Sequence, residues 1–177
     1  MRDAVRCCLA LALFAAACKT PLPVPVPILA PLPRLSDCPG RLRPTQDIEG
    51  DWVIHEQLRV TGGGVDESYA LVVQKTGPKL VLLGLTPFGA KAFSVVQIGT
   101  QTWAESYLGP ATAVPPENVL RDLHRALFLT VEDPALEPRA VTRDAEGAVH
   151  VAATACGYEA VLAPVSATPL PAAKPPG

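Results

Sequence analysis

The sequence has little of several features that mark common classes of protein. Aromatic residues make up only 5% of its 177 residues, and no charge of one sign dominates, because 15 Lys and Arg stand against 17 Asp and Glu. A protein that binds nucleic acid needs a basic patch to hold phosphates, so we expect no nucleic-acid partner. The apolar run at residues 7–17 has 11 residues and is too short to cross about 30 Å of hydrocarbon as a helix.

The motifs of common catalytic sites are also missing. There is no Gly-x-Ser-x-Gly elbow, His-Glu-x-x-His pair or Walker loop, and residues 62–64 (Gly-Gly-Gly) indicate a hairpin turn. His55, His124 and His150 lack the spacing of metal ligands and are expected on the surface or in packing. Asp122 lies two residues from His124 on an expected helix, where the two side chains point to different sides. We therefore expect no enzyme, no metal and no cofactor.

Proline, in contrast, is abundant and concentrated at the two flanks. Of the 20 prolines, eight fall within residues 19–44 and five within residues 164–177. Alternating prolines favour an extended polyproline II spacer. The composition divides the chain into a signal peptide, a lipid-anchored Pro-rich linker, one globular domain and a Pro-rich disordered tail: 1–17, 18–45, 46–163 and 164–177.

The N-terminal segment indicates export and lipidation. Arg2 and Arg6 precede the apolar run, whose last residues, 15–17, are small alanines directly before Cys18. This order resembles a bacterial lipoprotein signal, in which the cysteine is acylated and becomes the mature N-terminus. We therefore expect a chain held to the membrane by acyl chains on Cys18. An ordinary secretory signal is the alternative. Position 19, directly after the cysteine, is Lys. An aspartate there would mark inner-membrane retention in such lipoproteins, so its absence favours the outer membrane and a periplasm-facing domain.

Two cysteines remain in the mature chain beyond the lipidated one. Cys38 precedes the expected domain and Cys156 lies near its end, in a chain directed to an oxidising compartment. A disulfide between them would close a long loop and stabilise the fold by about 4–5 kcal/mol in the entropy model. Two free thiols are the alternative.

Between the flanks, the pattern changes from strands to one helix and back. Apolar residues alternate with polar ones along five consecutive segments, which short connections make antiparallel neighbours. Pro115, Pro116 and Glu117 then form a good helix start, and apolar residues recur at helical spacing over 115–129. The sequence thus predicts a mainly β fold (α+β), an antiparallel curved sheet with one packed helix. The expected strands are 51–60, 67–76, 79–85, 90–98, 100–108, 139–143, 148–154 and 158–163.

Two stretches resemble a known family. Residues 83–93 (LGLTPFGAKAF) and residues 119–129 (VLRDLHRALFL) are similar to the strand, turn and helix of a LolB-like bacterial lipoprotein family of unknown function. The resemblance implies a LolA/LolB-like half-barrel, whose inner face and helix enclose a cavity for acyl chains. It also implies non-catalytic binding or transfer of a hydrophobic ligand or lipoprotein cargo, since such genes often lie beside those for aryl-polyene or fatty-acid-like biosynthesis.

The apolar residues of strands and helix are the candidates for such a cavity. They are Trp52, Ile54, Leu58, Tyr69, Leu71, Leu82, Phe93, Trp103, Leu120, Leu123 and Leu127. LolB delivers its cargo with an exposed apolar loop, and either 86–89, with Pro87 and Phe88, or 108–114 could take that part here. The alternative function is a structural lipoprotein with a solid core, which holds an envelope protein partner.

Overall fold

The computed structural model describes residues 32–109, 112–129 and 139–170. The signal peptide, Cys18 and most of the Pro-rich linker therefore lie outside the described residues. The described elements are the 3₁₀ turn η1 and strands β1 to β5, then helix α1, and finally strands β6 to β8 with the 3₁₀ turn η4. Their bounds are η1 Thr45–Asp47, β1 Trp52–Gly62, β2 Val65–Thr76, β3 Lys79–Leu85, β4 Lys91–Ile98, β5 Gln101–Ser106, α1 Pro116–Leu127, β6 Ala140–Arg143, β7 Val149–Ala153, η4 Thr154–Cys156 and β8 Tyr158–Pro169.

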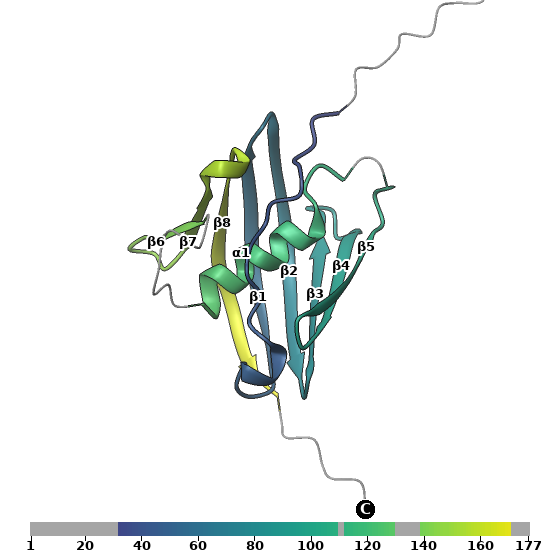
Figure 1. Ribbon diagram of the computed structural model, residues 1–177, viewed down its shortest axis with the longest axis vertical. Coiled ribbons are helices and arrows are strands. Elements are labelled where there is room, and N and C mark those ends of the chain that lie inside the picture. The colour runs from purple at the N-terminus through teal and green to yellow at the C-terminus, as the bar shows by residue number, and fades with distance from the viewer. Residues whose placement is uncertain (1–31, 110–111, 130–138, 171–177) are drawn as a thin grey trace, which may run out of the picture. The chain divides into compact units, whose positions relative to one another are not determined.

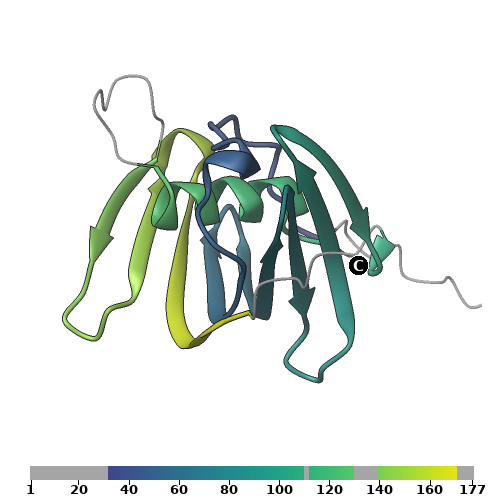
Figure 2. The same cartoon turned by 90° about the horizontal axis from the view of Figure 1, so that it is seen from below.

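All eight strands form one antiparallel sheet in the order β5-β4-β3-β2-β1-β8-β7-β6. Strand β8 returns beside β1, so the meander of β1 to β5 and the final three strands join into one sheet that remains open at β5 and β6. Helix α1 contacts β4 and β5 as well as β7 and β8, which requires the sheet to curve around it (Figures 1 and 2). The predicted fold class, a curved antiparallel sheet with one packed helix, is confirmed.

The period of two in the sequence separates the two faces of the sheet. In β2 the residues Tyr69, Leu71 and Val73 are buried on the inner face, while their neighbours are exposed or half-buried. Glu56, which interrupts the apolar pattern of β1, occupies an inner position and is only 7% exposed. Removal from water raises the pKa of this carboxyl group above its ordinary value.

The sheet extends further than the sequence predicts at the C-terminal end. We expected the domain to end at residue 163, but β8 continues to Pro169, which lies opposite Trp52 of β1. Proline cannot donate to a ladder, yet it is tolerated at bulges and strand ends. Pro164 lies where the register with β1 shifts, and Pro169 ends the strand. The predicted start of the disordered tail at residue 164 is therefore wrong, because residues 164–169 belong to β8. Residues 171–177 lie outside the described part.

A similar difference occurs at the N-terminal side of the domain. Residues 32–48, here called the strap, were assigned mainly to the linker, but Leu35, Cys38, Thr45 and Ile48 are buried. The strap crosses α1 on the side away from the sheet (Figures 1 and 2). The high proline content of the flank concealed these anchoring residues.

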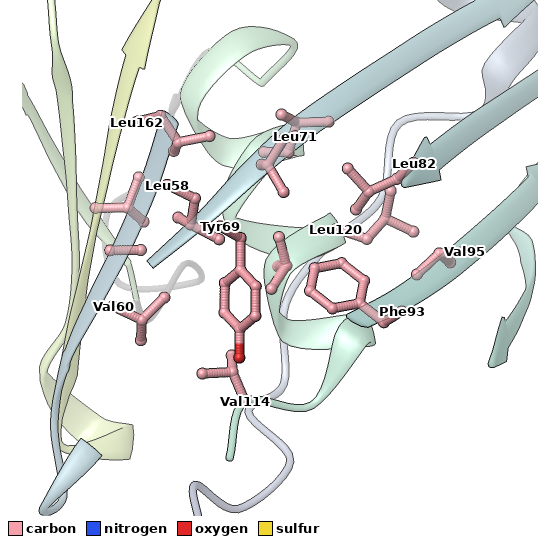
Figure 3. Packing of buried hydrophobic residues seen from close by; sticks show 14 of the residues in the cluster. Leu58, Val60, Tyr69, Leu71, Leu82, Phe93, Val95, Val114, Leu120 and Leu162 are labelled. Atoms are coloured by element: carbon pink, nitrogen blue, oxygen red, sulfur yellow. The ribbon is translucent and has the colours of Figure 1, made fainter. Parts of the chain in front are cut away.

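Gly84 and Phe93 explain why the first of the two familiar stretches contains a glycine and an aromatic residue. They lie opposite each other on β3 and β4, and a methyl group at Gly84 would overlap the Phe93 ring. The ring in turn meets Tyr69 edge-on, with 5.3 Å between ring centroids, in the middle of the core (Figure 3). Glycine is needed here because the aromatic ring occupies the position of a side chain.

We predict that Gly84→Ala lowers the free energy of unfolding by about 1–3 kcal/mol, as expected for overpacking in a filled core. The measurement is urea unfolding of the oxidised protein. In the Phe93→Leu background, the added methyl group should cost less, because the smaller side chain leaves room for it. Equal stability of Gly84→Ala and wild type would contradict this explanation.

Candidate functional site

The inner face of the sheet is where the sequence places the cavity, and the structure fills it with side chains. Seven candidates are at most 2% exposed and pack together between the sheet and α1 (Figure 3): Leu58, Tyr69, Leu71, Leu82, Phe93, Leu120 and Leu123. Trp52, Ile54 and Leu127 are half-buried at the border of the same cluster. The sheet and the helix thus bring these ten residues together as a packed layer.

Trp103, the eleventh candidate, lies elsewhere. It is 55% exposed and lies opposite Val96, which lies opposite Val81 in turn. Val81 and Val96 alternate with buried residues, so this row occupies the outer face of the sheet. The assignment of Trp103 to a cavity is wrong, because the strand alternation that places Ala104 inward places Trp103 outward.

The polar side of α1 is buried as well. With an apolar face on the sheet, the helical period turns Arg121, Asp122, His124 and Arg125 away from the core. They do face away from the sheet, but Asp122 and His124 are 0% exposed because the strap covers them. Buried polar groups need hydrogen-bond partners, and the strap provides them.

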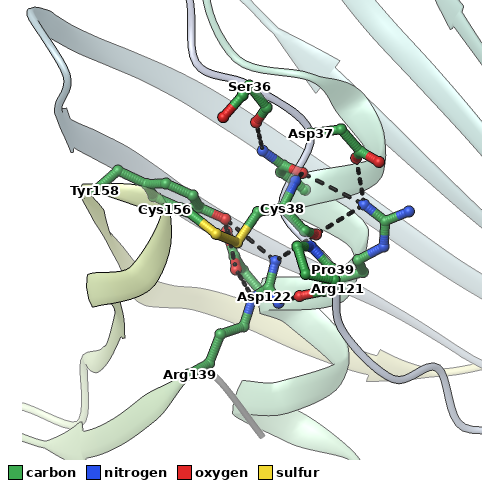
Figure 4. Close-up of a disulfide and its surroundings, with 10 residues drawn as sticks. Ser36, Asp37, Cys38, Pro39, Arg121, Asp122, Arg139, Cys156 and Tyr158 are labelled. Atoms are coloured by element: carbon green, nitrogen blue, oxygen red, sulfur yellow. Dashed lines mark hydrogen bonds and ion pairs between the residues drawn. A yellow bond between two sulfur atoms is a disulfide. The ribbon is translucent and has the colours of Figure 1, made fainter.

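Asn118 fixes the strap at the first turns of the helix. The Cys38 N–H donates to Asn118 Oδ1 at 2.8 Å, and Asn118 Nδ2 donates to the Ser36 carbonyl at 2.9 Å. Arg121 adds a hydrogen bond to the Cys38 carbonyl at 2.9 Å and an ion pair with Asp37 (Figure 4). In this part of the strap, backbone groups of Ser36 and Cys38 bond to helix side chains instead of to another strand.

Asp122 forms the centre of a second buried group. Arg139 Nε donates to Asp122 Oδ1 at 2.6 Å, and the Tyr158 hydroxyl donates to the same carboxylate at 3.0 Å (Figure 4). The Arg139 guanidinium also donates to the carbonyls of Cys38 and Pro39. Burial raises the pKa of Asp122 to about 6, although both donors oppose that shift. The group links helix, strap and β8, so it is a structural ion pair enclosed by protein.

A disulfide covers this group. Cys38 of the strap and Cys156 of η4 are joined across a sequence separation of 118 residues, with their Cα atoms 5.8 Å apart (Figure 4). This is the pairing expected from the sequence. Closing so long a loop restricts the unfolded chain and stabilises the fold by about 4–5 kcal/mol in the entropy model.

His124 connects the helix to the other end of the strap. The Arg43 backbone N–H donates to His124 Nδ1 at 3.0 Å, so Nδ1 is an acceptor and the proton is on Nε2, which donates to Gln97 Oε1 at 2.7 Å. Gln97 Nε2 donates to the Arg43 carbonyl at 2.9 Å. Burial lowers the pKa of His124 to about 4. Asp122 and His124 have different hydrogen-bond partners, so they do not form a catalytic pair with each other.

The turn between β3 and β4 is the most exposed apolar feature of the domain. Phe88 is 97% exposed. Two backbone hydrogen bonds close the turn beneath it. The Thr86 N–H donates to the Ala90 carbonyl at 2.8 Å, and the Gly89 N–H donates to the Thr86 carbonyl at 2.9 Å. In the competing loop, the described residues from Thr112 to Val114 are at most 9% exposed. Of the two candidate delivery loops, the one with Pro87 and Phe88 has the exposed apolar side chain.

A cleft of about 550 Å³ lies between the strap, the start of α1 and β5. Its lining is mainly polar: Arg34, Leu35, Ser36, Asp37, Thr102, Pro115, Glu117 and Arg121. Charged walls do not suit an acyl chain. In the described part of the chain, no His, Cys, Asp and Glu side chains gather in a group of three that could hold a metal ion.

Sequence reasoning missed the strap, and two signals could have indicated it. Asn118, Asp122 and His124 lie on the polar side of a helix that an open sheet cannot cover. Cys38, if paired with Cys156, has to bring its neighbours onto the domain. Together they indicate a covering segment, but neither specifies its path.

His124 predicts a loss of stability in acid. An unfolded histidine titrates near 6.5, whereas folding lowers its pKa to about 4. The unfolded state therefore binds a proton first as the pH falls, and stability is lost between these two values. We expect wild type to lose about 2 kcal/mol more than His124→Gln between pH 7.5 and pH 5, measured by urea unfolding at each pH. Parallel pH profiles of the two proteins would contradict a buried neutral His124.

Comparison with known proteins identifies one family. A family described as "Protein of unknown function (DUF3261)" matches residues 54–159, which is more than half of the chain. The match begins in β1 and ends at the start of β8, so it includes β2 to β7, the Phe88 turn and the helix. No curated protein matches the chain. No helix within residues 32–109, 112–129 and 139–170 is long and apolar enough to cross a bilayer. The chain therefore belongs to the DUF3261 family of proteins of unknown function.

Proposed function

We propose that this chain is a LolB-like lipoprotein, anchored to the membrane through Cys18, that binds a hydrophobic ligand in the cell envelope and passes it on without catalysis. The ligand class is an acyl or lipid-like molecule, or a lipoprotein. We propose the outer membrane as the bilayer that holds the anchor, with the domain facing the periplasm. The exposed Phe88 is the observation on which this proposal depends.

The position of Phe88 on the sheet supports contact with the membrane or with membrane-borne cargo. In an antiparallel meander, the β1–β2 and β3–β4 turns lie at the same end of the sheet. A methyl group at Gly64, in the first turn, would lie 3.2 Å from Pro33, so the strap starts at that end. Leu32, which is 68% exposed, begins the described domain there. The first described residues of the strap and the Phe88 turn therefore lie at the same end of the sheet.

The apolar layer between sheet and helix is a second argument for an apolar ligand. Its residues form one continuous apolar cluster between a sheet and a single helix. The helix is held on its far side by the strap, the buried ion pair and the disulfide. An acyl chain would gain about 25 cal/mol per Å² of apolar area removed from water, provided that α1 moves away from the sheet.

The packed inner face also favours a second candidate function. Leu71, Leu82, Phe93 and Leu123 are at most 1% exposed, as in a solid core. A structural envelope lipoprotein that holds a protein partner would need no more than this. In that function, Phe88 would contact the partner protein and no lipid would bind.

We predict that Phe88→Ser weakens ligand uptake by about tenfold or more, since an aromatic ring buried in a complex contributes about 1.5–3 kcal/mol. Phe88→Leu, which keeps an apolar side chain on the turn, should retain uptake. Native mass spectrometry of the full lipoprotein in mild detergent, with a diacylated lipopeptide added, measures the bound fraction. Val165→Ser serves as the control, because Val165 is 60% exposed but lies on β8.

The result separates the two functions. A lipid-range mass that is lost in Phe88→Ser and kept in both other variants supports the carrier. No uptake by wild type, together with a co-purified protein that Phe88→Ser releases, supports the structural function. Equal uptake by Phe88→Ser and wild type contradicts a role for the turn.

A further inference from the structure

We propose that β5 pairs with β5 of a second copy of this chain, so that two sheets join across a two-fold axis. Strand β5 forms one open edge of the sheet (Figures 1 and 2). An edge strand presents unpaired N–H and C=O groups to which another strand can bind. This inference does not depend on the proposed ligand.

The hydrogen bonds of β5 show which backbone groups are free. The Tyr107 N–H donates to the Ala92 carbonyl at 2.9 Å, and this pair continues the register of β4 and β5. Hydrogen-bonded pairs alternate along an antiparallel ladder, so every second residue counted back from Tyr107 bonds to β4. The residues between them direct their backbone groups to the open edge: Thr102, Ala104 and Ser106. Among the described residues, no other segment forms a backbone hydrogen bond with these three.

The β5 edge has few of the usual devices that prevent pairing, since Glu105 is its one charged residue. Natural edges are protected by Lys, Pro, bulges or short length. Strand β5 has neither Lys nor Pro, and its register with β4 has no shift. The opposite edge, β6, has only four residues and ends in Arg143. The two open edges of the sheet thus differ, and β5 is the edge to which another strand can pair more easily.

The sequence of β5 is compatible with pairing to itself. A two-fold axis through Ala104 places the three edge-directed residues opposite one another, with six backbone hydrogen bonds, because both copies contribute the same pattern. Thr102, Ala104 and Ser106 are small and allow close approach. Glu105 then lies opposite Trp103 of the other copy, so no two like charges face each other. A register centred on Glu105 would place two carboxylates together and is disfavoured.

This arrangement also accounts for Trp103. The side chain is 55% exposed on the outer face of the edge strand. With the axis at Ala104, the two Trp103 side chains are diagonal neighbours, which are within reach of aromatic side chains at about 7–8 Å. Tryptophan is enriched at the centres of protein interfaces. The second copy would therefore cover the largest exposed side chain of the strand.

A single cysteine tests the pairing in the protein as it exists. In the full lipoprotein in its own membrane, Ala104→Cys places two thiols at the axis, where the Cα atoms of a hydrogen-bonded pair are about 5.5 Å apart. A disulfide spans about 4.4–6.8 Å, so mild oxidation should convert most of the chain to a covalent dimer. Arg143→Cys on the β6 edge is the matched control and should stay monomeric. A monomeric Ala104→Cys, or equal dimer from both variants, would overturn the proposal.

A second variant tests the hydrogen bonds without introducing a thiol. Ala104→Pro removes an N–H that points to the open edge, so the ladder with β4 stays intact. Light scattering of the lipoprotein in mild detergent should give a two-copy mass for wild type and for Ala104→Ser, and a one-copy mass for Ala104→Pro with unchanged circular dichroism. A one-copy wild type, a different protein bound to it, or a two-copy Ala104→Pro would overturn the second copy as the partner.

Discussion

Helix α1 buries both of its faces, and buried polar side chains must be hydrogen-bonded. Its apolar face packs on the curved sheet. Its other face carries Asn118, Asp122 and His124, all 0% exposed. A single open sheet cannot cover both sides of a helix, so a third layer is required. The strap is that layer, and the Cys38–Cys156 disulfide joins it to η4, between β7 and β8.

This closed arrangement determines where the proposed ligand or partner could bind. The strap begins at the end of the sheet from which the Phe88 turn projects, so the segment that leads to the proposed anchor also holds the helix over the inner face. A ligand that enters the apolar layer must displace α1, and the strap determines how easily α1 moves. A ligand or partner that binds outside must use the Phe88 turn or the β5 edge.

The local periodicity of the sequence was enough to predict the meander, the helix and the fold class. Alternation in β2 and the helical spacing of Val119, Leu120 and Leu123 follow directly from burial on one side. The strap, the full length of β8 and the exposure of Trp103 depend on contacts between distant segments. Proline content concealed the first two, and the pattern of β5 does not reveal which of its faces meets the helix. The strap partners of the helix side chains lie about 80 positions away in the sequence, which no local pattern indicates.

The most direct test of this account is hydrogen exchange of the helix amides after reduction of the disulfide. Exchange measures local opening of each segment. With Cys38–Cys156 intact, residues 116–127 should be as protected as the central strands β1 to β3. After mild reduction, the helix and the strap should lose protection together while those strands keep theirs. Unchanged protection of the helix, or equal loss throughout the sheet, would contradict the conclusion that the strap holds the helix on the sheet.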